Sequence, residues 1–480
     1  MVSLCVCAPV KAQTQSDAFL SKYQLRKLVM VGRHGVRSAS LSTGERRITT
    51  HQWHKWSVGS GQLTERGALL EQYMGCYFRE WLRETGLFAD DDAVHASDCY
   101  VYANSMSRTV ATANSFLQGF MPQAGVEVLY NKNVTFGDMD EPFNNVSSYA
   151  GSYFLAKVKA EAEYACGEGG LAAMVDSMEK EAAVLADILD LTASPACMQG
   201  DTCSLTFPEI YNYLHKGWMP RIRGGRIDLT RLTAGNFILQ YYDAPYQEDG
   251  AFGHQISDDD LIRIGHIKEM WCYLSMGTPS VAKDAAHTLL IKLENVLQDD
   301  QHHFVYLVGH DSNLSSLTGA LSFKPYMLPN TPEMKNPLGG KLVFELWESE
   351  TGDTLVSTRY VYQNLDQVRD LLPLSMDCPP ASYPLEIMGL EANEDGMYRW
   401  HDMQSLIRQA IDDYAGLNVP LQYDVNLDGV VDMLDAVDIV SYSLGHPFKI
   451  FYTPQADVDG DGTLGVGDAI QLLGKIAGRK

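Results

Sequence analysis

The segment around His34 combines residue types that suit attack on a phosphate group. It reads RHGVR at 33–37, so the imidazole lies between the guanidinium groups of Arg33 and Arg37, directly after the apolar run 28–32. Guanidinium groups are rigid forks that match phosphate oxygens, and a neutral imidazole can act as a nucleophile toward phosphorus. The apolar run predicts a short buried strand, so we expect His34 at a strand end between two fixed cations.

A second strand and a second histidine lie far downstream. The apolar run 304–309 predicts another buried strand, and His310 and Asp311 follow it directly. In an open α/β sheet, the residues that follow the carboxyl ends of the strands meet in one crevice. We therefore expect His310 and Asp311 to lie beside His34 in a single site.

Further segments form a recognisable series along the chain. They are GQLTERG at 61–67, YANSMSRTVATANSF at 102–116, FGDMDEPFN at 136–144, SPAC at 194–197, LQYY at 239–242, VGHDSN at 308–313, FKPY at 323–326 and GGKLVFELW at 339–347. Together with RHGVR, this ordered set resembles the histidine acid phosphatases, branch 2 of the histidine phosphatase superfamily, and within that branch the bacterial periplasmic glucose-1-phosphatases. The resemblance covers residues from about 24 to about 412, and an ordered set is far more specific than a lone RHG.

The resemblance implies a role for each residue of the site. His34 would attack phosphorus and become phosphohistidine, and Asp311 would protonate the leaving alcohol and then activate water. The residues that would bind the phosphate oxygens are Arg33, Arg37, Arg108 and His310. Because an unperturbed Asp has a pKa of about 3.9, an acidic pH optimum is expected, and no step calls for a catalytic cofactor.

Three departures from the family pattern bear on the substrate. Ala39 stands where the family usually has proline, Leu41 stands where phytases of this branch tend to have lysine, and the downstream motif reads HDSN rather than HDTN. These residues favour sugar phosphomonoesters such as glucose 1-phosphate over a highly charged inositol phosphate. A phytase-like inositol phosphate phosphatase is the alternative enzyme, and a calcium-dependent docking protein with an inactive phosphatase domain is the alternative outside enzymes.

The order of elements predicts an α/β fold, an open sheet flanked by helices with an inserted, mostly helical cap domain. Strands are expected at 342–347 and 358–363 and an amphipathic helix at 281–300. The resemblance implies that residues 24–134 and 281–412 form the α/β phosphatase domain and that residues 135–280 form the cap.

Residues 420–480 repeat a calcium-loop pattern with a period of 33 residues. Oxygen-bearing residues at alternate positions wrap a hard cation, and glycine at the sixth position permits the sharp turn. The repeat resembles a type I dockerin and implies a small α-helical module that binds about two calcium ions and holds a cohesin-like protein, or else packs on the phosphatase as a self-contained unit. The expected ligands are Asp424, Asn426, Asp428, Val430, Asp432 and Asp435 in the first loop, and Asp457, Asp459, Asp461, Thr463 and Asp468 in the second.

Composition and the amino terminus bear on location and partners. The net charge of −24, from 37 basic and 61 acidic residues, argues against nucleic acid as a partner, and no stretch is long and apolar enough to span a membrane. Residues 1–23 are expected to be a signal remnant or leader, which places the protein in the periplasm or outside the cell. Export would oxidise Cys197 and Cys203, which lie where the family has a local disulfide.

Two histidines outside these motifs have the spacing of metal ligands. His51 and His54 lie three residues apart, but no carboxylate pattern accompanies them. We therefore expect this segment to be a loop that helps wall the pocket.

Overall fold

The computed structural model describes most of the chain, as residues 16–88, 95–133, 140–143, 149, 151–206, 212–215, 220–223 and 226–478. The expected leader up to residue 15 and most of the 136–144 segment lie outside these ranges. Within them, no helix is both long enough and apolar enough to cross a membrane.

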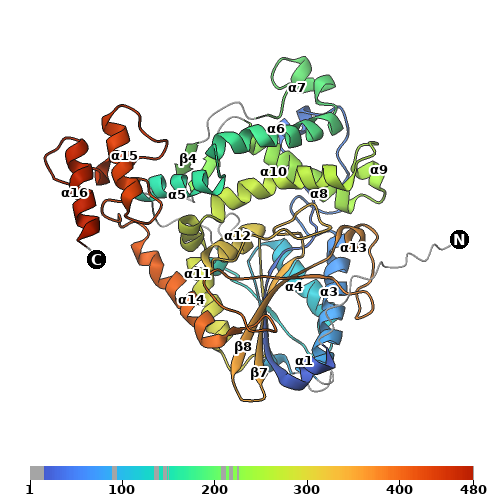
Figure 1. Ribbon diagram of the computed structural model, residues 1–480. Helices are drawn as coiled ribbons and strands as arrows, with labels where there is room; N and C mark the ends of the chain where they lie inside the picture. Colours follow the sequence, from blue (N-terminus) through green and yellow to red (C-terminus); the bar gives the residue numbers. More distant parts are fainter. Residues whose placement is uncertain are drawn as a thin grey trace.

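A mixed sheet lies at the centre of the α/β part (Figure 1), in the order β10-β8-β7-β1-β6-β2-β3, with β9 paired to β8. Strands β1, β6, β2 and β3 are parallel, and β7 and β8 continue the sheet in antiparallel fashion. The bounds are β1 (Tyr23–Arg33), β2 (Cys99–Ala103), β3 (Val128–Leu129), β6 (Phe304–Gly309), β7 (Lys341–Ser349), β8 (Thr354–Tyr362), β9 (Ala381–Pro384) and β10 (Tyr398–Arg399). The fold class expected from the sequence is confirmed.

Helices cover both faces of this sheet (Figure 1), which explains why β1 and β6 read as continuous apolar runs. Val29 of β1 packs with the helices on one face, whereas Leu28 and Met30 pack with those on the other. The first face is covered by α11 (Pro279–Gln298), α12 (Asp311–Ala320) and α14 (Trp400–Asp412), and the second by α3 (Glu65–Glu84) and α4 (Ser107–Phe120).

Helices α3 and α4 approach each other at glycines. A Cβ on Gly75 would lie 2.1 Å from the carbonyl oxygen of Phe116, and one on Gly119 would lie 1.9 Å from that of Gln72. Only hydrogen fits between the two backbones, so these glycines set the spacing of the helix pair. That spacing matters to the site because α4 carries Arg108 in its first turn.

A mostly helical layer lies beside the sheet and is inserted between β3 and α11 (Figure 1). Its elements are α5 (Ser152–Ala165), α6 (Gly170–Ile188), η4 (Leu191–Ala193), α7 (Pro195–Met198), β4 (Asn212–His215), β5 (Pro220–Arg223), α8 (Ile227–Asp243), α9 (Gln247–Gly250) and α10 (Asp258–Met276). The disulfide that the resemblance implied joins Cys197 of α7 to Cys203 in the segment that follows. Short elements elsewhere are α1 (Asp17–Lys22), α2 (Thr43–Arg47), η2 (Ala96–Asp98), η3 (Glu141–Phe143), α13 (Leu365–Arg369), η5 (Asp413–Gly416) and η6 (Thr453–Gln455).

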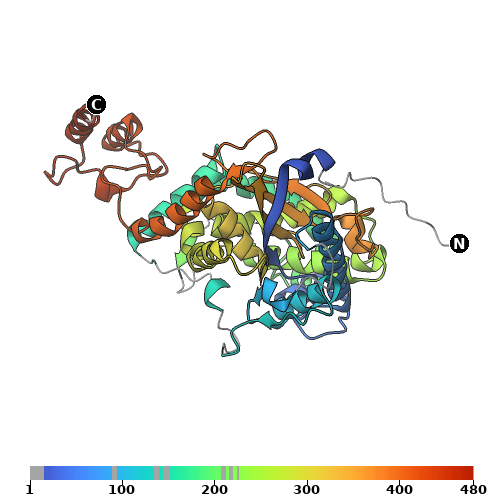
Figure 2. The same cartoon turned by 90° about the horizontal axis from the view of Figure 1, so that it is seen from below.

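The carboxyl-terminal segment forms a pair of helices that stands at one end of the molecule, next to α5 (Figures 1 and 2). Helices α15 (Met433–Ser443) and α16 (Val466–Ala477) pack against each other around a small apolar core. The apolar stretches 436–444 and 469–476 each predict a helix from the sequence, and each helix begins three residues before its stretch. The reason is local: Asp435 and Asp468 fall in the first helical turn, where their carboxylates accept the backbone N–H groups of Asp432 and Gly465.

We predict that Gly119→Ala lowers the melting temperature, because the added methyl group forces α3 and α4 apart at a cost of about 1–3 kcal/mol. Gly474→Ala in α16 is the matched control, since a Cβ there meets nothing within 4 Å and should be neutral or stabilising by up to about 1 kcal/mol. Thermal unfolding followed by circular dichroism compares the two variants. An equal change in melting temperature for the two variants would contradict the close approach of α3 and α4 at Gly119.

Candidate active site

Strands β1 and β6 bring His34 and His310 together. They pair in parallel with Arg33 opposite Gly309, so each strand ends at the same edge of the sheet. The backbone N–H of His34 donates to the Gly309 carbonyl at 3.0 Å, and the two imidazole centroids are 5.4 Å apart. A Cβ on Gly309 would lie 2.7 Å from both Phe143 and the Asn313 side chain, so the turn that presents His310 leaves room only for glycine.

The tautomer of His34 follows from the hydrogen bond that its side chain makes. Nδ1 lies 2.9 Å from the Gly35 carbonyl oxygen, which can only accept, so Nδ1 carries the proton. In the neutral ring, Nε2 then keeps its lone pair. The side chain is buried, with 4% of its surface exposed, which leaves Nε2 as a desolvated nucleophilic atom.

His310 is held in the opposite tautomer by an arginine. Its Nδ1 lies 3.3 Å from Nη2 of Arg108, and a guanidinium nitrogen can only donate, so Nδ1 accepts. Nε2 of His310 therefore carries the proton and can donate it in a hydrogen bond. One imidazole offers a lone pair and the other offers an N–H group, within the same crevice.

Burial and the neighbouring arginines keep both imidazoles neutral. Burial first, and repulsion from Arg108 second, hold the pKa of His34 well below its ordinary value, and the same two causes lower the pKa of His310 to about 3. Burial, followed by repulsion from Arg108 and Arg33, lowers the pKa of Arg37 to about 10. The guanidinium groups therefore supply the positive charge of the site, and the imidazoles supply none at mildly acidic pH.

The arginines also bring hydrogen-bond donors that the protein leaves unused. Nε of Arg33 and Nε of Arg108 are buried and have no partner among the described residues. Buried donors are normally satisfied, and unsatisfied cationic donors are costly. An anion with several oxygens, bound between the two histidines, would accept hydrogen bonds from these donors.

A lysine from the cap reaches this site as well. Lys268 of α10 lies 2.7 Å from Asp311 and 3.3 Å from Glu333, and Glu333 pairs with Arg33 at 2.7 Å. Burial raises the pKa of Asp311, but attraction to Lys268 and Arg33 outweighs it and holds that pKa well below its usual range. Asp311 is therefore ionised while the site holds no anion.

Lys268 and Glu333 were not predicted from the sequence, because neither lies within one of the family motifs. Glu333 is buried, 3% exposed, in the segment between α12 and β7. Its neighbour in space, Glu269, accepts the backbone N–H groups of Lys335 and Asn336, and burial raises its pKa to about 7. The only signal was a charged Lys-Glu pair within an otherwise apolar stretch of α10.

The expected calcium ligands gather in two loops before α15 and α16. In the first loop, Asp424 is fully buried, its Oδ1 has no partner among the described residues, and burial raises its pKa to about 6. In the second loop, carboxylate oxygens of Asp457, Asp459 and Asp468 lie within 4.8 Å of one another. Asp432, another expected ligand of the first loop, also caps α15, since its Oδ1 accepts the N–H of Leu434 at 2.7 Å.

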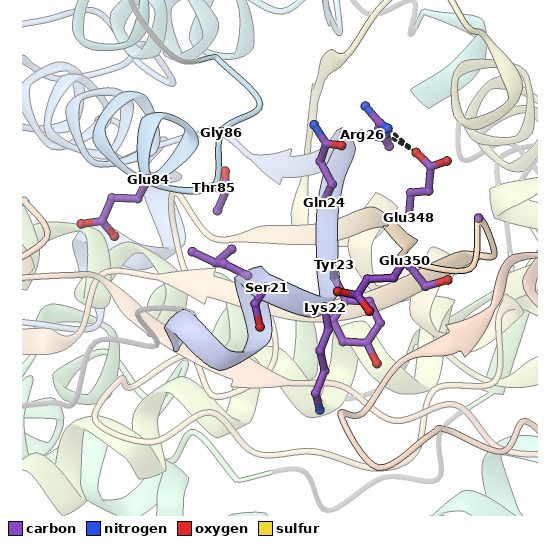
Figure 3. A pocket seen from close by; sticks show the side chains of 13 residues that line it. Ser21, Lys22, Tyr23, Gln24, Arg26, Glu84, Thr85, Gly86, Glu348 and Glu350 are labelled. Carbon is purple, nitrogen blue, oxygen red and sulfur yellow. Dashed lines mark hydrogen bonds and ion pairs between the residues drawn. The ribbon is translucent and has the colours of Figure 1, made fainter.

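A hollow at the other end of β1 has no part in this arrangement (Figure 3). It is lined by Tyr23, Gln24, Glu84 and their neighbours, and an ion pair between Arg26 and Glu348 lies at one side of it. It lies at the amino-terminal end of β1, roughly 30 Å along the strand from the histidines at 3.3 Å per residue. This hollow is therefore separate from the crevice that His34 and His310 share.

The chain is similar to known proteins over most of its length. The profile of the histidine phosphatase superfamily (branch 2) matches residues 24–162. A glucose-1-phosphatase of Providencia rettgeri is 30% identical over 417 residues, which cover 84% of this chain and 95% of that protein. A glucose-1-phosphatase of Salmonella typhimurium is 32% identical over 403 residues, which cover 81% and 92%. The chain belongs to branch 2 of the histidine phosphatase superfamily.

The fold of this histidine acid phosphatase is shared with solved structures. The phytase of Hafnia alvei in its apo form matches with a TM-score of 0.74 and 26% identity, over 83% of this chain and 99% of the phytase.

Proposed function

We propose that this protein is an exported acid phosphatase that hydrolyses sugar phosphomonoesters of the glucose 1-phosphate kind through a phosphohistidine at His34. The observation that carries the proposal is the neutral His34 with a free Nε2 lone pair, beside Arg33, Arg37 and Arg108. A nucleophile among cations is what attack on a dianionic phosphate requires.

In the first step, the Nε2–P bond forms while the bond from phosphorus to the leaving oxygen breaks. Asp311, protonated when substrate is bound at acidic pH, gives its proton to the departing alcohol. The arginines and the Nε2–H of His310 donate to the phosphoryl oxygens. In the second step, ionised Asp311 takes a proton from water, the water oxygen bonds to phosphorus, and the P–N bond breaks to release inorganic phosphate.

Lys268 links substrate binding to the protonation of Asp311. While the site is empty, Lys268 holds Asp311 ionised. A bound phosphate brings negative charge close to Asp311 and competes for the same lysine, and both effects raise the pKa of the carboxyl group. Proton uptake thus accompanies binding, which fits an acidic pH optimum.

The choice of substrate rests on the motif and on the relatives. HDSN and Leu41 favour a sugar phosphate, and two similar proteins are glucose-1-phosphatases. The phytase-like alternative is supported by the match of the fold to the Hafnia alvei phytase. A docking protein without activity is disfavoured because Arg33, His34 and Asp311 are all present in one crevice.

Export and a calcium-bound carboxyl-terminal module belong to the same proposal. The Cys197–Cys203 disulfide supports an oxidising compartment. The buried, unpartnered Oδ1 of Asp424 supports a cation in the first loop, and the carboxylates gathered around Asp457 support one in the second. We infer that residues 24–134 and 281–412 form the catalytic domain, 135–280 the cap and 420–480 the module.

The module has one face on the cap and another turned to solvent. The Tyr164 hydroxyl donates to the Asn426 carbonyl at 2.8 Å, and Lys449 pairs with Glu163 at 2.7 Å. A cohesin-like partner would bind the outer faces, which expose large apolar side chains. These side chains are Met433, Leu434, Val437, Leu444, Val466, Ile470 and Leu473.

We expect kcat/KM for glucose 1-phosphate to exceed that for inositol hexakisphosphate, and His34→Ala to lower turnover of both by roughly 10³-fold or more. Phosphate release at acidic pH measures both. The control is His401→Ala, since the side chain of His401 is 88% exposed and should not matter. Better hydrolysis of the hexakisphosphate would favour the phytase alternative, and an active His34→Ala would remove the nucleophile.

Lys268→Met should raise the pKa of Asp311, since it removes the strongest attraction on that carboxylate. Asp311 then stays protonated to higher pH, so the alkaline limb of kcat/KM for an alkyl phosphate should move up by about one pH unit. Lys324→Met, at an exposed lysine paired only with Glu386 among the described residues, is the control. A limb that stays in place or moves down would show that Asp311 is not the acid.

Calcium should bind with a stoichiometry of about two ions and raise the melting temperature, because the loop carboxylates repel one another without it. Calorimetry of Asp424→Ala should find one site fewer, whereas Glu391→Gln, at an exposed acid outside the loops, should change nothing.

Deleting residues 420–480 should leave kcat unchanged. Absence of calcium binding, or a large fall in kcat on deletion, would defeat the assignment.

A further inference from the structure

Three side chains of types that can bind a metal meet where the loop of residues 38–62 lies against the cap. They are His51, Asp190 and His254, and they come from three separate segments: the loop before α3, the turn after α6 and the turn after α9. The sequence offered no carboxylate for His51, because Asp190 lies far away in the chain. The fold supplies that carboxylate.

The ligand atoms are close enough to share one ion. Nε2 of His51 lies 2.8 Å from Oδ2 of Asp190, and one ligand atom from each of the three residues lies within 4.8 Å of the others. In a tetrahedral zinc site, metal–ligand bonds of about 2.0–2.1 Å place ligand atoms about 3.3 Å apart. Small side-chain rotations would bring this cluster to that geometry.

The neighbouring residues orient the side chains of His51, Asp190 and His254 toward one another. Asp190 occupies the N-cap position of η4, yet its carboxylate makes no capping bond and instead faces His51. The His51 ring stacks on Phe252 at 4.9 Å, which fixes its plane, and lies edge-on to His254 at 5.8 Å. Within the described residues, neither ring nitrogen of His254 has a hydrogen-bond partner, so the ring has a free lone pair.

We propose that His51, Asp190 and His254 bind one zinc-class divalent transition-metal ion, with water in the remaining coordination position. Two imidazoles and one carboxylate are the donor set that such ions take. Calcium, a hard cation, takes oxygen ligands instead. The site is therefore chemically distinct from the carboxylate loops before α15 and α16.

The ion would fasten the loop of residues 38–62 to the cap. This loop leaves the phosphatase crevice at Arg37 and returns at Leu63, where the two residues form a β-bridge. Partway along it, Trp53 packs against the apolar core of the cap. A metal at His51 would join the loop to two cap segments at once, so the ion is a structural clip and stands outside the chemical steps.

Zinc titration of the full-length protein without a histidine tag, stripped by chelator and kept in saturating calcium, tests the proposal. Calorimetry should find one zinc ion, and cobalt substitution should give the visible absorption of a tetrahedral site. His51→Gln, Asp190→Asn and His254→Gln should each weaken zinc binding at least as much as the roughly 10–100-fold that loss of an outer-shell partner costs. Zinc should also raise the melting temperature of the wild type and not of these variants.

The matched control is His54→Gln. His54 also faces a carboxylate, with Nε2 3.3 Å from Asp243, but within the described residues no third ligand joins the pair. This variant should bind zinc like the wild type. Equal zinc affinity in the wild type and in His51→Gln/His254→Gln, or a loss in His54→Gln as large as in the others, would overturn the proposal. If a glutamine variant fails to fold, Asp190→Asn decides, since the Asp190 side chain is 45% exposed.

Discussion

The parallel pairing of β1 with β6 is the constraint on which the rest of this structure depends. It sets Arg33 opposite Gly309, so that the residues after the two strands, His34 and His310, enter the same crevice. A slip of one residue would turn every side chain of a strand to its other face. The helices on both faces lock the register, because alternate residues of β1 belong to two separate apolar cores.

That register creates an electrostatic problem which the surrounding charges resolve. Arginines buried next to two histidines would be unfavourable unless they were paired or bound an anion. The protein keeps the histidines neutral and pairs Arg33 with the buried Glu333. Two other donors, Nε of Arg33 and Nε of Arg108, have no hydrogen-bond acceptor among the described residues. Part of the desolvation cost is thus left for a bound phosphate to offset, and binding energy is concentrated where the reaction occurs.

The cap contributes to the site and also connects it to the rest of the chain. Lys268 of α10 sets the charge of Asp311 in the crevice. At another surface of the cap, α5 carries Tyr164, which contacts the first of the two acidic loops. The loop after Arg37 joins the cap through Trp53 and His51. One helical layer therefore contacts both the catalytic edge of the sheet and the carboxyl-terminal helices.

The sequence by itself determined the family, the two strands that end in histidines, and the two acidic loops with glycine at the sixth position. Each of these is a local pattern, formed by residues that are close together in the chain. Only the tertiary structure decided the contacts between segments far apart in the chain. Lys268 and Glu333 lie 65 positions apart, and Asp190 lies 139 positions from His51. No local pattern marks such pairs, since helix packing and loop paths bring them together. The starts of α15 and α16 also differed from expectation, because carboxylates in the first helical turn cap each helix and extend it beyond its apolar stretch.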